Sequence, residues 1–373
     1  MKITKRSFII ILVAGVFISL LSFFVFYSDL PWNKWSANKV YREYSSAVVL
    51  VHTKWSYRIK VDGKDITGDF YKLNIGIPQS IIGMYEEGDE DGNFSVKSSY
   101  YDYTATAFFI REDGMLATNL HVVRPWLFGQ DAEKKDKLEK DLRRFYEGKA
   151  SKNDTLYRYI AKNLKVEGVL DSIWIIENGK ADIVKNRIPC KLLEGDSSII
   201  SELYNRENTN YYDCSCDATI FQTANKKLPS SLDRLIPICN FNDSFDRIGE
   251  EIFSIGYPYG NSSVCIPSWE KYGELCNIIN NGIISQDRGL LGFGHNISSG
   301  PGSSGSPIIN SKGKLIGLHS SGTSGVSGID GLNQAVSIEL ISIYLHEWDE
   351  YQVRRIKRTN IKDWSSYRDF VLL

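Results

Sequence analysis

From Ser46 onward the chain is divided into short apolar runs, each closed by turn residues. The turns are rich in Gly, Asn and Asp, residue types that tolerate the backbone conformations of tight turns. Many short runs at close spacing indicate strands and favour an all-β sandwich or barrel. The predicted strands are 46–57, 104–110, 115–123, 169–177, 188–193, 218–223, 251–255, 276–285, 307–310, 315–320 and 334–338.

Two stretches depart from this pattern and are predicted to be helical. Residues 131–164 are dense in Lys, Glu and Arg, and their apolar residues recur at helical spacing. We interpret them as a surface helical insertion between strands, and a solvated flap without its own function is the simpler interpretation. Residues 339–358 are expected to form a C-terminal helix that packs an apolar face on the barrel. The apolar positions of the insertion are Leu138, Leu142, Phe145, Tyr146, Tyr157 and Ile160.

The first 27 residues predict a membrane anchor. Residues 7–27 carry no charge, and Lys2, Lys5 and Arg6 precede them. A helix of this length spans roughly 30 Å at about 1.5 Å per residue, the thickness of a bilayer's hydrocarbon core. A cleaved signal peptide is the alternative, but residues 27–32 fit a cleavage site poorly. The basic cluster places residues 1–6 in the cytoplasm and the rest of the chain outside it.

Charge and cysteine content exclude some functions. The 44 Lys and Arg residues nearly balance the 45 Asp and Glu residues, so the overall charge gives no indication of a nucleic-acid partner. The close pair Cys214 and Cys216 has no second pair to complete a zinc site, and no cofactor is predicted. The six cysteines form an even set, which is compatible with disulfides outside the cytosol.

The segment Gly300-Pro-Gly-Ser-Ser-Gly-Ser-Pro307 carries the strongest chemical signal. Glycines around a serine form a tight turn whose backbone N–H groups can point at one place. A nucleophilic serine needs such a turn, because the oxyanion of its tetrahedral intermediate must be hydrogen-bonded. The N–H groups of Gly302 and Ser304 are the predicted donors. Such loops are also common linkers, but two predicted strands follow this one directly.

A serine nucleophile needs a histidine base that a carboxylate orients. The chain has five histidines, and His121 lies at the end of a predicted strand, where its side chain can turn into a cleft. Asp217 opens the predicted strand 218–223. Taken singly, each has an ordinary explanation as a structural histidine and a turn residue.

The segments together resemble trypsin-like peptidases of the HtrA type. Residues 107–123 resemble the histidine segment of that family, 217–221 the aspartate segment, and 302–307 the nucleophile motif Gly-x-Ser-Gly-x-Pro. Residues 248–260 and 280–285 resemble strands between them, and all the segments follow the order of the family. The resemblance covers residues 46–344 in pieces.

The resemblance implies two six-stranded antiparallel β-barrels with a catalytic triad in the cleft between them. It selects Ser304 as nucleophile over Ser303 and Ser306, His121 as general base and Asp217 as the residue that orients it. Asp182 and Asp213 are weaker rivals for the acid. The implied reaction is cleavage of protein or peptide substrates through an acyl-enzyme. Only about 30 residues follow Tyr344, too few for a PDZ domain.

His319 lies where the glutamyl endopeptidases that this chain resembles place a pocket histidine. There it hydrogen-bonds a Glu or Gln side chain, and Ser299 matches a hydroxyl position that binds the same carboxylate. We therefore expect preference for Glu, or second for Gln, before the scissile bond; packing of His319 without a ligand role is an equal alternative. Ser320 to Gly322 would offer backbone groups to an extended substrate.

The prediction is thus a membrane-anchored serine endopeptidase with its catalytic domain outside the cytoplasm. The alternative is a catalytically silent, membrane-tethered peptide-binding protein. An HtrA-like stress protease with chaperone behaviour is a further alternative. The expected organisation is a cytoplasmic tail (1–6), an anchor (7–27), a linker (28–45), a peptidase domain (46–350) and a C-terminal tail (351–373).

Overall fold

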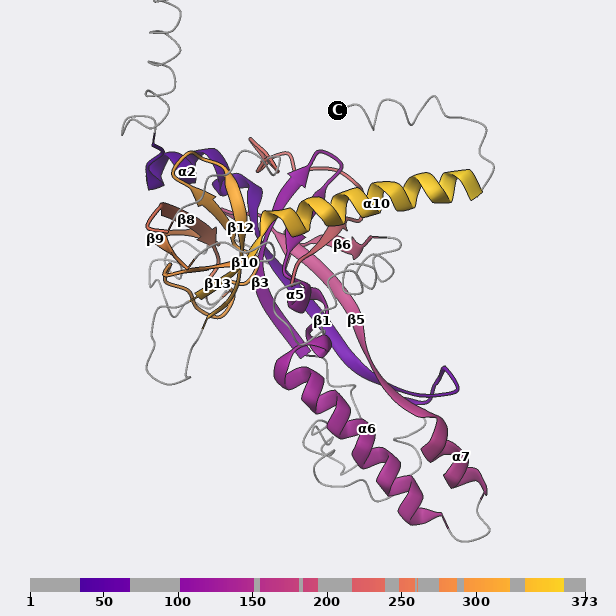
Figure 1. The fold of residues 1–373 in the computed structure, drawn as a ribbon. Helices are drawn as coiled ribbons and strands as arrows, with labels where there is room; N and C mark the ends of the chain where they lie inside the picture. Colours follow the sequence, from indigo (N-terminus) through magenta and orange to yellow (C-terminus); the bar gives the residue numbers. More distant parts are fainter. Residues whose placement is uncertain are drawn as a thin grey trace, which may run out of the picture.

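The computed structural model contains two β-barrels side by side, with two helical extensions (Figure 1). It describes residues 34–67, 101–150, 155–180, 184–193, 217–238, 248–258, 260, 275–286, 292–322 and 333–358, the last five without their side chains. The predicted anchor, residues 7–27, and the tail 1–6 lie outside these ranges. Within them, no helix combines the length and hydropathy needed to cross a membrane.

The first barrel is a closed antiparallel sheet of six strands. Its order is β1-β3-β4-β7-β6-β5, and pairing between β1 and β5 closes it. A short strand, β2 (Lys64–Asp65), pairs with the end of β1. The six strands are β1 (Val48–Val61), β3 (Tyr101–Arg111), β4 (Met115–Thr118), β5 (Leu164–Ile176), β6 (Ile188–Leu192) and β7 (Thr219–Thr223).

The second barrel is also closed and antiparallel, in the order β10-β13-β12-β11-β8-β9. Two six-stranded barrels confirm the predicted fold. The sequence pattern did not predict β10, whose residues Gly-Phe-Gly-His lack an apolar run. A side chain at Gly292 would come within 2.4 Å of the Ala335 carbonyl oxygen, so close strand approach requires glycine there. The strands are β8 (Glu251–Gly256), β9 (Ile278–Gln286), β10 (Gly292–His295), β11 (Pro307–Asn310), β12 (Leu315–Gly322) and β13 (Asn333–Ser337).

One hydrophobic core extends across both barrels. It joins Phe108 of the first barrel to Phe253 and Leu318 of the second. Helix α2 (Ala37–Tyr44) and the 3₁₀ turn η2 (Ser45–Ala47) belong to it, with Val40 and Tyr44 buried. The predicted linker 28–45 therefore includes a packed helix, because its apolar residues share one face.

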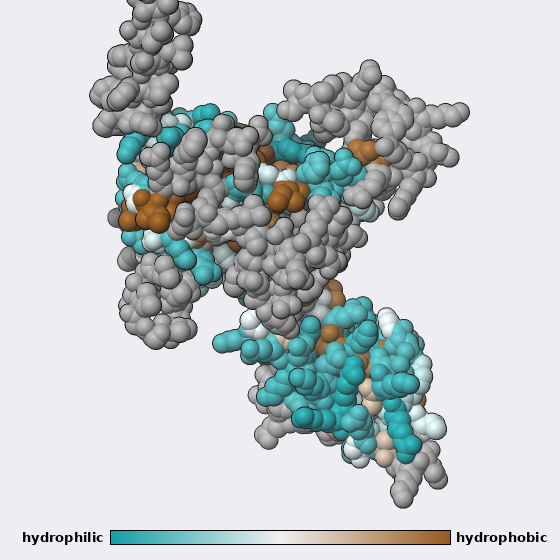
Figure 2. Space-filling view, in the orientation of Figure 1, coloured by the Kyte–Doolittle hydropathy of each residue, from teal (hydrophilic) through white to brown (hydrophobic). Residues whose placement is uncertain are grey.

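The predicted insertion 131–164 is helical, as expected, and forms an arm with its own core. Helices α6 (Gly129–Lys149) and α7 (Thr155–Asn163) project away from the barrels, beside the far ends of β1 and β5 (Figure 1). Their buried residues Leu138, Leu142 and Tyr146 pack with Trp55 and other residues of β1 and β5 in a second hydrophobic cluster. The outward face of the arm seen in Figure 2 is mostly hydrophilic, which matches its Lys- and Glu-rich sequence.

The predicted C-terminal helix is also present, as α10 (Ile338–Arg358). Ile341 and Tyr344 are fully buried in the shared core, and the helix packs on β7, β12 and β13. It continues beyond residue 350, the expected end of the domain, and its later turns extend past the barrels (Figure 1).

Candidate active site

His121 lies on a short helix, not on a strand as predicted. Strand β4 ends at Thr118, and α5 (Leu120–Val123) follows it. The change occurs at buried Asn119, whose side-chain amide donates to the Asp217 backbone carbonyl at 2.7 Å. This bond ties the start of α5 to the segment that carries Asp217, and it places the His121 side chain 19% exposed.

Asp217 is the buried acceptor at the centre of the site, with its side chain only 2% exposed. One carboxylate oxygen accepts the backbone N–H of His121 at 2.9 Å. The other lies 2.6 Å from His121 Nδ1 and accepts the Ser320 hydroxyl at 2.7 Å. Because a carboxylate accepts hydrogen bonds, Nδ1 carries the proton and Nε2 is left as the basic nitrogen. The rival residues Asp182 and Asp213 lie outside the described residues.

Ser304 lies in the glycine-rich turn between β10 and β11, beside this pair. The turn requires glycine, because Gly302 and Gly305 have φ of 95° and 83°. A side chain at Gly305 would also come within 2.1 Å of the Thr106 carbonyl oxygen. The Thr106 N–H donates to the Ser304 carbonyl at 2.9 Å, so β3 of the first barrel holds the turn in place.

The Ser304 hydroxyl makes its hydrogen bond with β12 of the second barrel. It donates to the Ser320 carbonyl at 3.2 Å, and no hydrogen bond among the described residues joins it to His121. The N–H groups of Gly302 and Ser304, the predicted oxyanion donors, have no acceptor within the described part of the chain. The intervening Ser303 N–H donates to the Gly300 carbonyl at 2.9 Å.

His319 is buried on β12 and is half of a histidine pair that the sequence did not predict. The Ile297 N–H donates to His295 Nδ1 at 3.2 Å, so the proton of His295 is on Nε2. That nitrogen lies 3.1 Å from His319 Nδ1 and donates to it, which leaves His319 with a protonated Nε2.

Both histidines are neutral at physiological pH. Burial lowers the pKa of His319 to about 4, and repulsion by His121 adds to the effect. Burial, with repulsion by His319, lowers the pKa of His295 to about 3. His319 is therefore an uncharged N–H donor beside the candidate triad.

The remaining predicted substrate-binding residues are on the same side of the second barrel. The Ser299 hydroxyl donates to Asn333 Oδ1 at 3.2 Å, and Asn333 pairs with Gly322 of β12 and His295 of β10. Within the described residues no hydrogen bond joins Ser299 to His319. Ser320 serves the triad directly through its hydroxyl and carbonyl.

Two aromatic residues beside His121 were not predicted. Tyr103 and Phe128 meet its imidazole edge-on, with ring centroids 6.2 Å and 6.0 Å away. Neither belongs to a motif, and only the fold brings them to the site.

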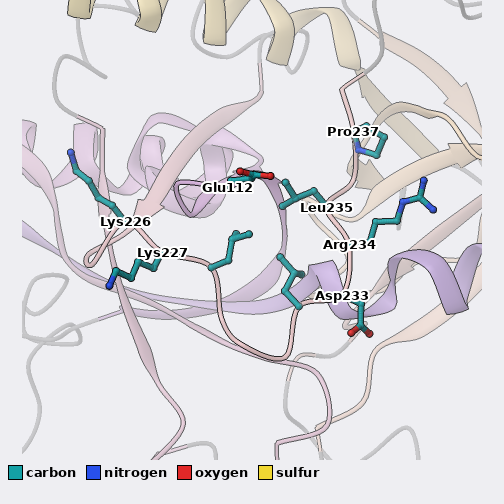
Figure 3. A pocket seen from close by; sticks show the side chains of 9 residues that line it. Glu112, Lys226, Lys227, Asp233, Arg234, Leu235 and Pro237 are labelled. Atoms are coloured by element: carbon teal, nitrogen blue, oxygen red, sulfur yellow. The ribbon is translucent and has the colours of Figure 1, made fainter. Parts of the chain in front are cut away.

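A separate pocket of about 600 Å³ contains none of the candidate site residues. Figure 3 shows Lys226 and Lys227 on one side of it, and Asp233 and Arg234 on the other. Because the lysines that line it are exposed, this pocket is an open depression on the protein surface.

Two of the six cysteines lie in the described part of the chain. Cys190 is a free thiol, and Cys214, Cys216, Cys239 and Cys265 lie outside the described residues. Among the described residues, no group of three or more His, Cys, Asp or Glu side chains is arranged to hold a metal ion.

Two six-stranded antiparallel barrels, with a His–Asp pair and a serine turn between them, define a chymotrypsin-like protein. The chain belongs to the trypsin-like peptidase domain family, whose model matches residues 105–318.

The curated relative Serine protease Do-like HtrA of Bacillus subtilis (strain 168) is 28% identical over 145 residues, which are 39% of this chain and 31% of the relative. The chain thus spans about a third of that relative's length. A serine endoprotease from Yersinia pestis aligns over 86% of this chain and 68% of its own, with 15% identity and a TM-score of 0.41. The HtrA-type protease AlgW with a decapeptide aligns over 82% and 64%, with 14% identity and a TM-score of 0.42.

Proposed function

We propose that the chain is a serine endopeptidase in which Ser304 is the nucleophile, His121 the general base and Asp217 the residue that orients His121. The observation that carries this proposal is the 2.6 Å contact between His121 Nδ1 and the buried Asp217 carboxylate, beside a serine in a glycine-constrained turn. The contact fixes the tautomer that leaves Nε2 free to accept a proton.

In the proposed reaction, Ser304 rotates about its Cα–Cβ bond and gives its proton to His121 Nε2 while Oγ attacks the peptide carbonyl. The N–H groups of Gly302 and Ser304 stabilise the oxyanion. His121 then protonates the leaving amine, which departs and leaves an ester on Ser304. Water, deprotonated by His121, cleaves the ester and releases the acid product.

Labelling of the full-length chain with a fluorophosphonate tests the nucleophile. We expect the wild type to be labelled covalently, Ser304→Ala to remain unlabelled, and His121→Ala to react at least 10³-fold more slowly, on the order of the loss typical of triad residues. The matched control is Ser306→Ala, because Ser306 is buried in the same turn and its hydroxyl has no hydrogen-bond partner among the described residues. Loss of labelling in Ser306→Ala but not in Ser304→Ala would show that Ser306, and not Ser304, is the nucleophile.

A second candidate is a catalytically silent peptide-binding protein, which the absence of a Ser304–His121 hydrogen bond favours. It predicts a folded wild type that binds extended peptides but is never labelled. The labelling experiment therefore separates the two functions.

For the peptidase we propose preference for Glu, or second for Gln, before the scissile bond. Support comes from His319, whose protonated Nε2 is fixed by His295 through the 3.1 Å hydrogen bond. An uncharged donor suits the side-chain oxygen of either residue, and a site built for one hydrogen bond discriminates by up to about 10⁴-fold. Cleavage of a peptide series that differs only at this position should favour Glu or Gln in the wild type and lose the preference in His319→Ala. Preference for Lys, Arg or small apolar residues would refute it.

We further propose that residues 7–27 tether the enzyme to a membrane, with the catalytic domain outside the cytoplasm. Support comes from the length of the uncharged run and the basic residues before it. The full chain should resist alkaline extraction from membranes, whereas a chain that starts at residue 34 should be extracted. Release of both chains would exclude the tether.

A further inference from the structure

Two aromatic rings that belong to no motif lie against the imidazole of His121. Tyr103 and Phe128 meet it edge-on, with ring centroids 6.2 Å and 6.0 Å away. Both side chains pack against the shared hydrophobic core, yet each is only partly buried. The candidate general base is thus bordered by apolar surface that a substrate can contact.

The backbone of Tyr103 is fixed relative to His121. Tyr103 lies on β3 and pairs in register with Thr53 of β1. The Thr53 hydroxyl donates to the Val122 carbonyl of α5, the helix that carries His121, at 3.1 Å. The same strand holds the nucleophile turn through the Thr106 N–H. The fold therefore sets the place of this ring beside the candidate triad.

Phe128 lies where the chain passes from the site into the arm. It follows the 3₁₀ turn η3 (Pro125–Leu127) and directly precedes α6. Its N–H donates to the Pro125 carbonyl at 2.9 Å, and its carbonyl accepts the Ala132 N–H at 3.1 Å. Because both backbone groups are hydrogen-bonded, the ring is held beside His121 by a structured segment and not by an open loop.

The proposed reaction decides which part of a substrate meets these rings. In that reaction the acyl part of the substrate lies along Ser320 to Gly322 of the second barrel, and Ser304 attacks its carbonyl. His121 protonates the leaving amine, which must lie within hydrogen-bond distance of the imidazole. An extended peptide continues in one direction through the site. The residue after the scissile bond therefore leaves β12 and reaches the first-barrel side, where Tyr103 and Phe128 lie.

We infer that Tyr103 and Phe128 form the subsite for the residue directly after the scissile bond, and that this subsite takes a large apolar side chain. The inference rests on the proposed peptidase function and adds a substrate preference on the leaving-group side. A large apolar side chain placed on the two rings removes apolar surface from water on both partners, which favours its binding. An aromatic side chain also gains from edge-on or offset contacts with the rings. A small side chain such as that of Ala gains little from either.

Cleavage of a peptide series by the full chain tests the subsite. Each peptide carries an equimolar mixture of residues before the bond and one chosen residue after it, and mass spectrometry identifies the bond that is cut. We expect cleavage before Phe or Leu to be faster than cleavage before Ala by at least about 10-fold, the lower end of what an apolar group contributes in a pocket. Tyr103→Ala and Phe128→Ala should each bring these rates closer together.

The matched control is Tyr101→Ala, the same substitution two residues earlier on β3. The Tyr101 ring stacks on Trp55 in the cluster of the arm, with centroids 4.4 Å apart. This variant should keep the wild-type preference. Equal loss of preference in Tyr101→Ala and Tyr103→Ala would indicate general loosening of β3 and would overturn the inference.

A gain of cleavage tests the subsite in a way that misfolding cannot imitate. Phe128→Asp places a carboxylate where the leaving-group side chain lies, which favours a cationic residue there. The ratio of cleavage before Lys to cleavage before Phe should therefore rise relative to the wild type. An unchanged ratio in this variant would show that Phe128 does not contact the residue after the bond.

The outcomes separate this inference from the proposed function. Cleavage of all peptides at equal rates overturns the subsite and leaves the peptidase intact, and so does a preference that both alanine variants retain. If the alanine variants instead change the preference for a residue before the bond, the assignment of the rings to the leaving-group side is wrong. If a folded wild type cleaves none of the peptides, the inference and the peptidase function fail together.

Discussion

Asp217 illustrates how a buried charge is made tolerable at the scale of one residue. Removing a carboxylate from water is costly unless hydrogen bonds replace the lost hydration. Here the His121 backbone, the His121 ring and the Ser320 hydroxyl all face the two oxygens. Because the backbone N–H and the ring Nδ1 of His121 both bind this carboxylate, the hydrogen bonds that stabilise the buried charge also orient the imidazole.

The histidine pair leads to a prediction about acid stability. Each folded-state pKa, about 4 for His319 and about 3 for His295, lies below the ordinary value of about 6.5 that the unfolded chain has. Above about pH 6.5 both histidines are neutral in the folded and in the unfolded chain, so their protonation does not reduce the free energy of unfolding. As the pH falls from about 6.5 to 4, the unfolded chain binds protons that the folded chain cannot, so the free energy of unfolding decreases.

Urea unfolding at a series of pH values measures this loss. We expect His295→Gln, which retains an N–H donor for His319, to decline less steeply than the wild type over this range. His346→Gln, at an exposed histidine of α10, is the control and should follow the wild-type slope. A slope in His295→Gln equal to that of the wild type would show that His295 does not resist protonation.

Among the elements, those with an apolar pattern could be predicted from the sequence. The predicted strands 307–310 and 315–320 correspond to β11 and β12. They could be predicted because each is an unbroken apolar run and Gly313 marks the turn between them. Strand β10 could not be predicted, because its glycines are selected by close strand approach, a tertiary effect. The short α5 was missed for a similar reason: the break at Asn119 depends on its bond to the distant Asp217 segment.

The candidate triad was predictable because each member lies in a motif, whereas its neighbours were not. Tyr103 and His295 lie beside the site only through strand pairing, and no local pattern marks them. The orientation of the Ser304 hydroxyl likewise depends on Ser320, a residue of another strand.

The arm yields a prediction at the scale of one helix. Leu142 of α6 is fully buried in the cluster that joins the arm helices to β1 and β5. Leu142→Ala should lower the free energy of unfolding by about 2–5 kcal/mol, as for other buried leucines. Urea unfolding measures it, and Lys140→Ala, at an exposed position of the same helix, should change it by less than about 0.5 kcal/mol. Equal effects would mean that α6 does not pack on the sheet.

At the scale of the whole molecule, α2 binds the two barrels together. The Trp35 N–H donates to the Ser311 carbonyl at 2.7 Å, and the Tyr44 hydroxyl donates to the Gly313 carbonyl at 2.9 Å, both in the second barrel. The chain then enters β1 of the first barrel directly after η2. The segment before the first strand is thus part of the shared core.

Removal of this segment should therefore destabilise both barrels at once. A chain that starts at Ser46 loses the buried side chains of Val40 and Tyr44, at a cost of more than roughly 3 kcal/mol. We expect its thermal unfolding, followed by circular dichroism and tryptophan fluorescence, to show one transition at a lower midpoint. A chain that starts at residue 34 keeps α2 and is the control. Equal midpoints for the two chains would contradict the proposed role of α2.

The long pair β1 and β5 has a mechanical consequence. The two strands are hydrogen-bonded from Leu50 and Ile176 in the barrel to Val61 and Leu164 in the arm. Paired backbone of this kind resists bending more than a loop does, so we expect the arm to move as a stiff extension of the first barrel. Its pairing changes register between Lys54 and Trp55, and such a bulge bends a strand. A load applied at the tip of the arm would therefore be concentrated at that bulge, next to Thr53, whose hydroxyl donates to the Val122 carbonyl of α5 at 3.1 Å.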